Sequence, residues 1–156
     1  MRRTAALSTA AVAASLTVVA ATVVAGSADA FTEKELKACW AAPVGGSLPL
    51  TVSVSGRQTG QRTLSNGTCK AWDVPAGVYT FSANAGAIRA IFDSGPAGRT
   101  AVCGNAAFTG FNVFATVKRL QQTYTVTLGN NGGSFNVPVS KNKLTKANFR
   151  IKCYTV

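Results

Sequence analysis

The chain has 156 residues, of which 16 are Lys or Arg and 5 are Asp or Glu, and its formal net charge is +11. A chain of this length forms one domain at most. It contains no His, so the most common zinc ligand and the most common proton carrier near neutral pH are both missing. These features argue against most hydrolase mechanisms. The positive charge favours an anionic polymer or surface as partner.

Residues 1–30 have the features of a secretory signal peptide. Arg2 and Arg3 are followed by an uncharged run rich in Ala and Val, which ends at the small-residue pattern Ala28–Asp29–Ala30. We expect cleavage after Ala30, which leaves a single β-rich extracellular domain at 31–156 with 14 basic and 4 acidic residues. The alternative is an uncleaved membrane anchor, because the run is long enough to span a bilayer. Its many small residues and the cleavage pattern favour a secreted protein with no transmembrane segment after cleavage.

Four cysteines, Cys39, Cys69, Cys103 and Cys153, lie in the expected exported part. An even number of cysteines in an oxidising compartment indicates two disulfides. We favour Cys39–Cys69 and Cys103–Cys153, because sequential pairing closes each bridge within one half of the domain, although the other two pairings stay open. No cysteine pair has C-x-x-C spacing and no His completes a ligand set, so we expect no metal and no cofactor.

The mature chain opens with Phe31–Cys39, which has helical composition but spans only about two turns and is therefore marginal as a helix. Alternating apolar and polar residues then predict a series of short strands. The expected strands are Leu48–Val54, Thr68–Val74, Val78–Ala83, Ile88–Phe92, Thr100–Cys103, Phe111–Val117, Thr123–Leu128, Phe135–Val139 and Asn148–Thr155. Turn signals separate them at Gly56–Gly60, Asn66–Gly67, Pro75–Gly77, Asp93–Gly98 and Asn130–Gly133. The pattern predicts an all-β protein, a small antiparallel β-sandwich with a small β-barrel as the alternative.

The segment Asp73–Thr80 reads DVPAGVYT. It resembles a segment common in immunoglobulin-like and transthyretin-like sandwich modules, in which a strand ends, turns at Pro-x-Gly and resumes at a Tyr. The resemblance favours the sandwich over the barrel and implies no function. A small secreted β domain with two disulfides is also similar in design to bacterial exported enzyme inhibitors and antibiotic-carrying apoproteins.

Catalytic chemistry finds little support in the sequence. Glu33, Glu35, Asp73 and Asp93 are the only carboxylates after residue 30. A glycosidase needs two facing carboxylates, and Asp73 with Asp93 is the one plausible pair, but Asp at a turn usually bonds its own backbone. A serine nucleophile lacks an imidazole or a buried Lys. We therefore expect a protein that is not an enzyme.

Basic residues cluster near the C-terminus. The cluster consists of Lys141, Lys143, Lys146, Arg150 and Lys152, to which Lys118 and Arg119 are added from another strand. Strand alternation places Arg150 and Lys152 on one face, away from Phe149, Ile151 and Cys153. We interpret these residues as a cationic C-terminal edge that binds an anionic partner. The alternative is that lysines on a final strand block edge-to-edge aggregation and keep the protein soluble.

The leading hypothesis is a secreted, non-enzymatic binding protein at the cell envelope. Its expected partner is an anionic cell-wall polymer, an acidic lipid surface or an acidic protein. Nucleic acid is less favoured because it would need exposed aromatics between the cations, and Phe108, Phe111 and Phe114 are better explained by core packing. Two alternatives stay open. One is an exported inhibitor of a protease or glycosidase that presents Val74–Val78 or Asp93–Gly98, and the other is a small-ligand carrier with a cleft between its sheets.

Overall fold

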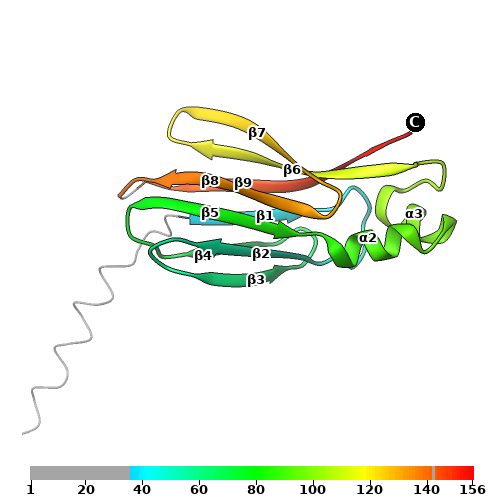
Figure 1. The fold of residues 1–156 in the computed structure, drawn as a ribbon, viewed down its shortest axis with the longest axis horizontal. Coiled ribbons are helices and arrows are strands. Elements are labelled where there is room, and N and C mark those ends of the chain that lie inside the picture. Colours follow the sequence, from blue (N-terminus) through cyan, green and yellow to red (C-terminus); the bar gives the residue numbers. More distant parts are fainter. Residues whose placement is uncertain (1–35, 142) are drawn as a thin grey trace, which may run out of the picture. The chain divides into compact units, whose positions relative to one another are not determined.

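The computed structural model describes residues 36–141 and 143–156 (Figure 1). The expected signal peptide and its cleavage site lie outside these residues. The described part of the chain forms nine strands and two short helices. In chain order these are β1 (Leu36–Ala41), β2 (Leu50–Ser55), β3 (Gly60–Leu64), β4 (Cys69–Trp72), β5 (Gly77–Asn84), α2 (Gly86–Asp93), α3 (Pro96–Cys103), β6 (Gly110–Arg119), β7 (Gln122–Gly129), β8 (Gly132–Val139) and β9 (Thr145–Tyr154).

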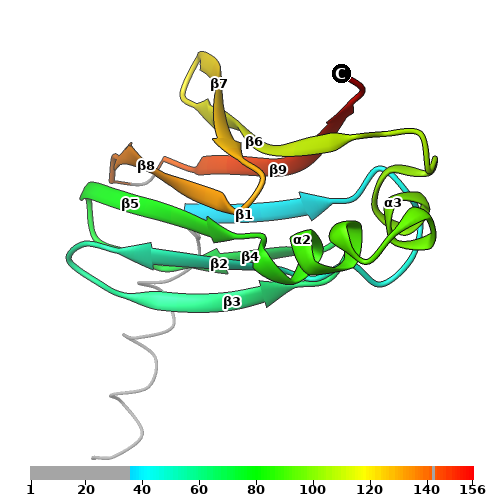
Figure 2. The same ribbon diagram turned by 45° about the vertical axis from the view of Figure 1, so that its right-hand side comes forward.

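The strands form two sheets that pack face to face (Figures 1 and 2). One is five-stranded with the order β4-β1-β9-β6-β7, and the other is four-stranded with the order β3-β2-β5-β8. The predicted all-β sandwich is confirmed, because the two sheets are separate and do not close into one barrel. The expectation of a fully antiparallel arrangement is wrong at one pair, since β1 runs parallel to β9. These strands are far apart in the sequence, so no hairpin forces them to be antiparallel.

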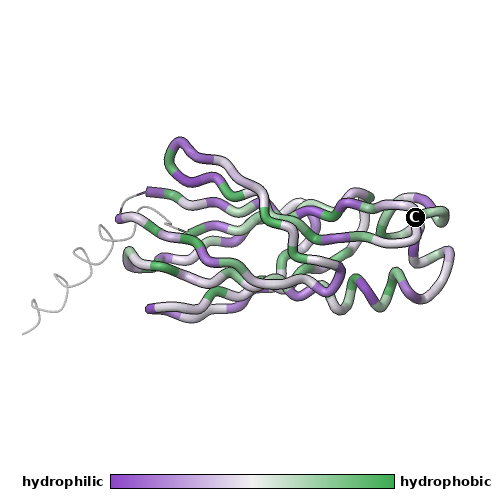
Figure 3. Tube along the Cα trace, turned by 45° about the horizontal axis from the view of Figure 1, so that its top comes forward, coloured by the Kyte–Doolittle hydropathy of each residue, from purple (hydrophilic) through white to green (hydrophobic). Residues whose placement is uncertain are grey.

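The core lies between the two sheets and is built from the alternating apolar residues of their strands (Figure 3). Phe81 of β5 is at its centre. Its ring centroid lies 5.9 Å from that of Phe149 on β9 and 6.0 Å from that of Trp72 on β4. Both contacts are edge-to-face, the arrangement that aromatic pairs prefer. Phe81 therefore joins the four-stranded sheet to two strands of the five-stranded sheet.

Both expected disulfides are present. Cys39 on β1 bonds to Cys69 on β4, and the two residues are directly opposite each other in the sheet. Cys103 at the end of α3 bonds to Cys153 on β9. Each bridge therefore has an end in the five-stranded sheet, and no strand of the four-stranded sheet contains a cysteine.

Two predicted strands are helices instead. The segment Ile88–Phe92 belongs to α2, in which Ile88 and Phe92 are buried one turn apart. Arg89 Nε donates to Asp93 Oδ2 at 3.0 Å, also one turn apart. The Phe92 ring packs against Phe111 of β6 with ring centroids 5.2 Å apart. The helical spacing extends over only two turns, and so short an apolar run has the same pattern as a buried strand.

The second misread segment, Thr100–Cys103, belongs to α3. This helix has Pro96 in its first turn and is followed by Gly104, whose φ of +80° is left-handed. Proline at the start and glycine just past the end are typical helix boundaries. The helices α2 and α3 lie next to each other (Figure 2), and a Cβ on Gly98 would overlap the carbonyl oxygen of Ile91. Glycine at position 98 therefore permits their close approach.

The helical composition of Phe31–Cys39 does not produce a helix in the part that the structure describes. From Leu36 the chain forms β1, with Leu36, Ala38 and Trp40 buried. Pairing with β4 on one side and β9 on the other gives this segment hydrogen bonds that a two-turn helix would lack. The strand β3 was not predicted, because this edge strand buries only Leu64 and has no alternating apolar pattern.

Candidate functional site

The cationic strand β9 is not at an edge. It lies between β1 and β6 in the middle of the five-stranded sheet, so the predicted cationic edge is corrected to a cationic sheet face. Sheet order depends on pairing between distant segments, which the periodicity of a single strand does not reveal. One part of the alternative explanation, that the β9 lysines block edge-to-edge pairing, no longer applies, because β9 has partners on both sides. The other part, that these cations keep the protein soluble, stays open.

The predicted alternation along β9 holds. Arg150 and Lys152 are exposed, whereas Phe149 and Ile151 are buried. Cys153 is half-buried and bonded to Cys103. The outer face of the five-stranded sheet, meaning the face that points away from the other sheet, therefore carries the β9 cations.

Three lysines lie side by side across this outer face. Lys118 of β6 is opposite Lys146 of β9, and Lys146 is opposite Lys37 of β1. We call Lys37, Lys118 and Lys146 the lysine row. None of the five strands of this sheet contains Asp or Glu. Like charges directly opposite each other destabilise a sheet, so the row lowers the stability of the isolated domain and an anion placed over it would relieve the repulsion.

Lys37 is a site residue that sequence reasoning missed. It lies more than a hundred residues before Lys146 in the chain, in a segment of helical composition. Only the parallel pairing of the first and last described strands brings it beside Lys146. Lys37 lies between two apolar residues, Leu36 and Ala38, which is the pattern of an outward-facing residue in a strand. Nothing in the sequence indicates which residue of another strand lies beside it.

The seven predicted cations separate into two groups. Lys118, Lys146, Arg150 and Lys152 share the outer face, as described above. Arg119, Lys141 and Lys143 belong to the ends of strands and to the segment between β8 and β9. Arg119 is half-buried and its Nη2 donates to Ser140 Oγ at 3.2 Å. Together with Lys143 it lines a hollow of about 640 Å³ at the turn between β6 and β7.

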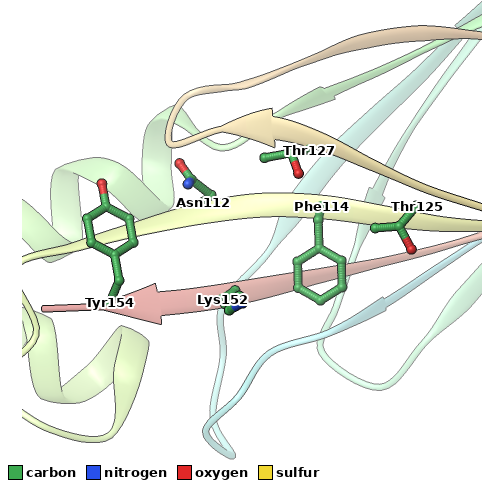
Figure 4. Close-up of a pocket in the computed structure, with 6 residues that line it drawn as sticks. All are labelled: Asn112, Phe114, Thr125, Thr127, Lys152 and Tyr154. Carbon is green, nitrogen blue, oxygen red and sulfur yellow. The ribbon is translucent and has the colours of Figure 1, made fainter.

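A second hollow, of about 580 Å³, opens on the outer face itself (Figure 4). We call it the aromatic hollow, and it is lined by Asn112 and Phe114 of β6, Thr125 and Thr127 of β7, and Lys152 and Tyr154 of β9. Phe111 and Phe114 point to opposite faces of β6. Core packing is correct for the buried Phe111 but wrong for Phe114, which lines the hollow.

On the other side of β9 a smaller hollow of about 170 Å³ lies beside the Cys39–Cys69 bridge. Lys146, Asn148 and Arg150 line it from β9. The cations of β9 therefore line hollows on both sides of the strand. Both hollows include outward-facing residues of one sheet, whereas the carrier hypothesis expected a cleft between the two sheets.

The other candidate sites are placed as follows. Asp93 is exposed at the end of α2 and pairs with Arg89, and Asp73 follows β4. Neither carboxylate lines any of the three hollows described above. Of the two proposed inhibitor loops, Asp93–Gly98 is occupied by the end of α2 and the start of α3. The other, Val74–Val78, is a turn held by Tyr79, whose hydroxyl donates to the carbonyl of Pro75 at 2.6 Å.

No family model, curated protein or solved structure matches the chain. Among the residues the structure describes, no three His, Cys, Asp or Glu side chains come together as metal ligands. Neither helix in the described ranges is long and apolar enough to cross a membrane. The fold and the site define a small all-β sandwich, braced by two disulfides, with five cations on the outer face of one sheet.

Proposed function

We propose that this protein is a secreted, non-enzymatic binding protein that associates with an anionic polymer or surface of the cell envelope. Its binding surface is the outer face of the five-stranded sheet. The observation that carries the proposal is the lysine row, with Arg150 and Lys152 beside it, in a sheet whose strands contain no carboxylate. The signal-like residues 1–30 and the two disulfides support the extracellular location.

The spacing of the cations suits an extended ligand. Lys146 and Lys152 are six residues apart on β9, which corresponds to about 20 Å along a strand. The lysine row crosses two strand spacings, or about 10 Å. A basic side chain near an anionic surface contributes about 1 kcal/mol. Five such contacts give a dissociation constant on the order of 0.1 mM for one molecule, so binding is weak unless the ligand is long or multivalent.

The test measures binding of residues 31–156 to polyphosphate and to anionic vesicles over a range of salt concentrations. We expect binding to weaken steeply as salt is added, because the contacts are screened. A triple variant, Lys37→Gln, Lys118→Gln and Lys146→Gln, should lose about a hundredfold in affinity, from about 1 kcal/mol for each cation.

The matched control is the triple variant Arg57→Gln, Arg62→Gln and Arg99→Gln, which changes the net charge equally but lies outside the five-stranded sheet. We expect it to bind almost as well as the unaltered protein. Equal losses in the two triple variants would show that net charge alone drives binding. Binding that does not respond to salt would contradict the proposal itself.

A further inference from the structure

The aromatic hollow contains features that a simple cationic surface does not need. Two aromatic side chains, Phe114 and Tyr154, line it together with three uncharged polar side chains and Lys152 (Figure 4). A surface that attracted anions by charge alone would use only the cations. The rings and the polar groups therefore indicate a ligand that also has an apolar surface and hydrogen-bonding groups.

Tyr154 is held in place by its surroundings. It lies opposite Gly110 in the sheet, and a Cβ on Gly110 would overlap the Tyr154 ring. The ring therefore rests directly on the backbone of β6. The carbonyl of Tyr154 accepts from the backbone N–H of Thr109 at 3.0 Å, and the preceding residue, Cys153, is bonded to α3. Because the residue is still 39% exposed, Tyr154 forms a fixed platform that a ligand can reach.

The polar side chains of the hollow have free hydrogen-bonding capacity. Asn112, Thr125 and Thr127 make no side-chain hydrogen bond to any other residue that the structure describes. An amide and a hydroxyl group each donate and accept hydrogen bonds. They match a ligand whose own polar groups also do both, as the hydroxyl groups of a sugar do.

We propose that the outer face of the five-stranded sheet binds an acidic polysaccharide, a chain of carboxylate-bearing sugars. Tyr154 lies opposite Gly110, four residues before Phe114 on β6, so the two rings are about 13 Å apart along the strands. One sugar ring therefore packs its apolar face against Tyr154 and another, further along the same chain, packs against Phe114, while their hydroxyl groups bond to the polar side chains of the aromatic hollow. The carboxylate of the sugar on Tyr154 is held by Lys152, and carboxylates further along the chain are held by Arg150 and Lys146. This inference rests on the proposed function and specifies the ligand class for the same surface.

Single-stranded nucleic acid fits the same surface less well. Proteins that bind it stack successive bases on aromatic rings along a basic groove. Here both rings lie in one hollow, and the remaining outward residues of β9, Lys146, Asn148 and Arg150, include no aromatic side chain. Polyphosphate would use the cations and leave the rings and hydroxyl groups without a role.

The experiment compares the affinity of residues 31–156 for polygalacturonate, polyphosphate and a single-stranded oligothymidylate at one salt concentration. The test variants are Phe114→Ala and Thr127→Val, the second of which removes a hydroxyl group at nearly constant shape. Each should weaken polygalacturonate binding by about tenfold or less and leave polyphosphate binding unchanged. Gly110→Ala, which pushes the Tyr154 ring away without altering any charge, should act in the same direction. Tyr154→Phe, which keeps the ring on Gly110, is the control and should retain most of the affinity.

The outcomes separate the two proposals. If polyphosphate and polygalacturonate bind equally and these variants have no effect on either, the sugar assignment is overturned and the proposed function stands. If oligothymidylate binds most tightly and depends most on Phe114, the ligand is a nucleic acid and the sugar assignment is again overturned. If no polyanion binds in a salt-dependent way, the proposed function itself fails. Urea unfolding of each variant shows whether a lost affinity reflects a lost fold.

Discussion

The outer faces of the two sheets differ in how their polar side chains are satisfied. On the four-stranded sheet they pair with one another: Thr80 Oγ1 donates to Asn136 Oδ1 at 2.8 Å, and the hydroxyl groups of Thr51 and Thr63 lie 3.5 Å apart. The strands of that sheet contain a single cation, Arg62. On the five-stranded sheet the outward side chains include five cations, and the strands contain no carboxylate to pair with them. The amide and hydroxyl groups of the aromatic hollow, next to these cations, make no side-chain hydrogen bond to other described residues.

The two sheets also differ in covalent bracing, since both disulfides end in the five-stranded sheet. The two energies can be compared. Each like-charge pair across neighbouring strands costs up to about 1 kcal/mol, whereas each bridge contributes about 4 kcal/mol by constraining the unfolded chain. The stabilisation from the bridges thus exceeds the cost of a densely charged face, which the four-stranded sheet with its single cation does not have. Three variants, each with a comparison variant, test this difference.

The largest effect is expected from removing the bridge between α3 and β9. The double variant Cys103→Ser and Cys153→Ser should lower the free energy of unfolding by about 4 kcal/mol, because the bridge closes a loop of 50 residues. Urea unfolding measures this loss. Affinity for polygalacturonate should also fall, since Tyr154 follows the released cysteine directly.

The comparison variant is Cys39→Ser with Cys69→Ser, which opens a loop of 30 residues between two neighbouring strands. Its loss of stability should be similar, about 4 kcal/mol on the same model, but β9 and Tyr154 keep their attachments. Identical losses of affinity in the two double variants would show that the bridge to α3 does not position Tyr154.

A smaller effect, with opposite signs for stability and binding, is expected from Lys146→Glu. A carboxylate at this position would lie opposite Lys118 on one side and Lys37 on the other. Replacing two repulsions by two attractions should stabilise the fold by about 1 kcal/mol, as measured by urea unfolding. Affinity for polyphosphate should fall by more than about tenfold, because one cation is lost and its neighbours are neutralised.

The control for this variant is Asn148→Glu, two residues further along the same face. Asn148 is opposite Thr116 and Cys39, so the same kind of charge is introduced without a lysine directly across from it. We expect no comparable gain in stability. If both variants stabilised the domain equally, the gain would come from lowering the net charge and not from the lysine row.

The sequence was informative where local periodicity or covalent chemistry decides the structure. Alternation predicted most strands and the outward direction of Arg150 and Lys152. The even number of cysteines predicted two bridges, and the preference for sequential pairing selected the right ones. The sequence failed where the outcome depends on distant segments. Nothing local indicates that β9 is central or that Lys37 lies beside Lys146, and a two-turn helix such as α2 offers too few periods to be distinguished from a strand. The aromatic hollow was missed for the same reason, since it needs three strands to be aligned.

The smallest effect concerns the turn between β6 and β7 of the five-stranded sheet. Leu120 has a left-handed backbone with φ of +53°, which is unfavourable for a leucine, whereas Gly67 provides the positive φ in the turn before β4. Because Leu120 is 50% exposed, Leu120→Asn loses little buried area, and Asn tolerates this conformation better. We expect a gain of about 0.5–1 kcal/mol in urea unfolding and unchanged polygalacturonate affinity. Leu144→Asn, at an exposed leucine without positive φ, should show no gain. A gain in both would attribute the effect to the loss of an exposed apolar side chain and not to the backbone of the turn.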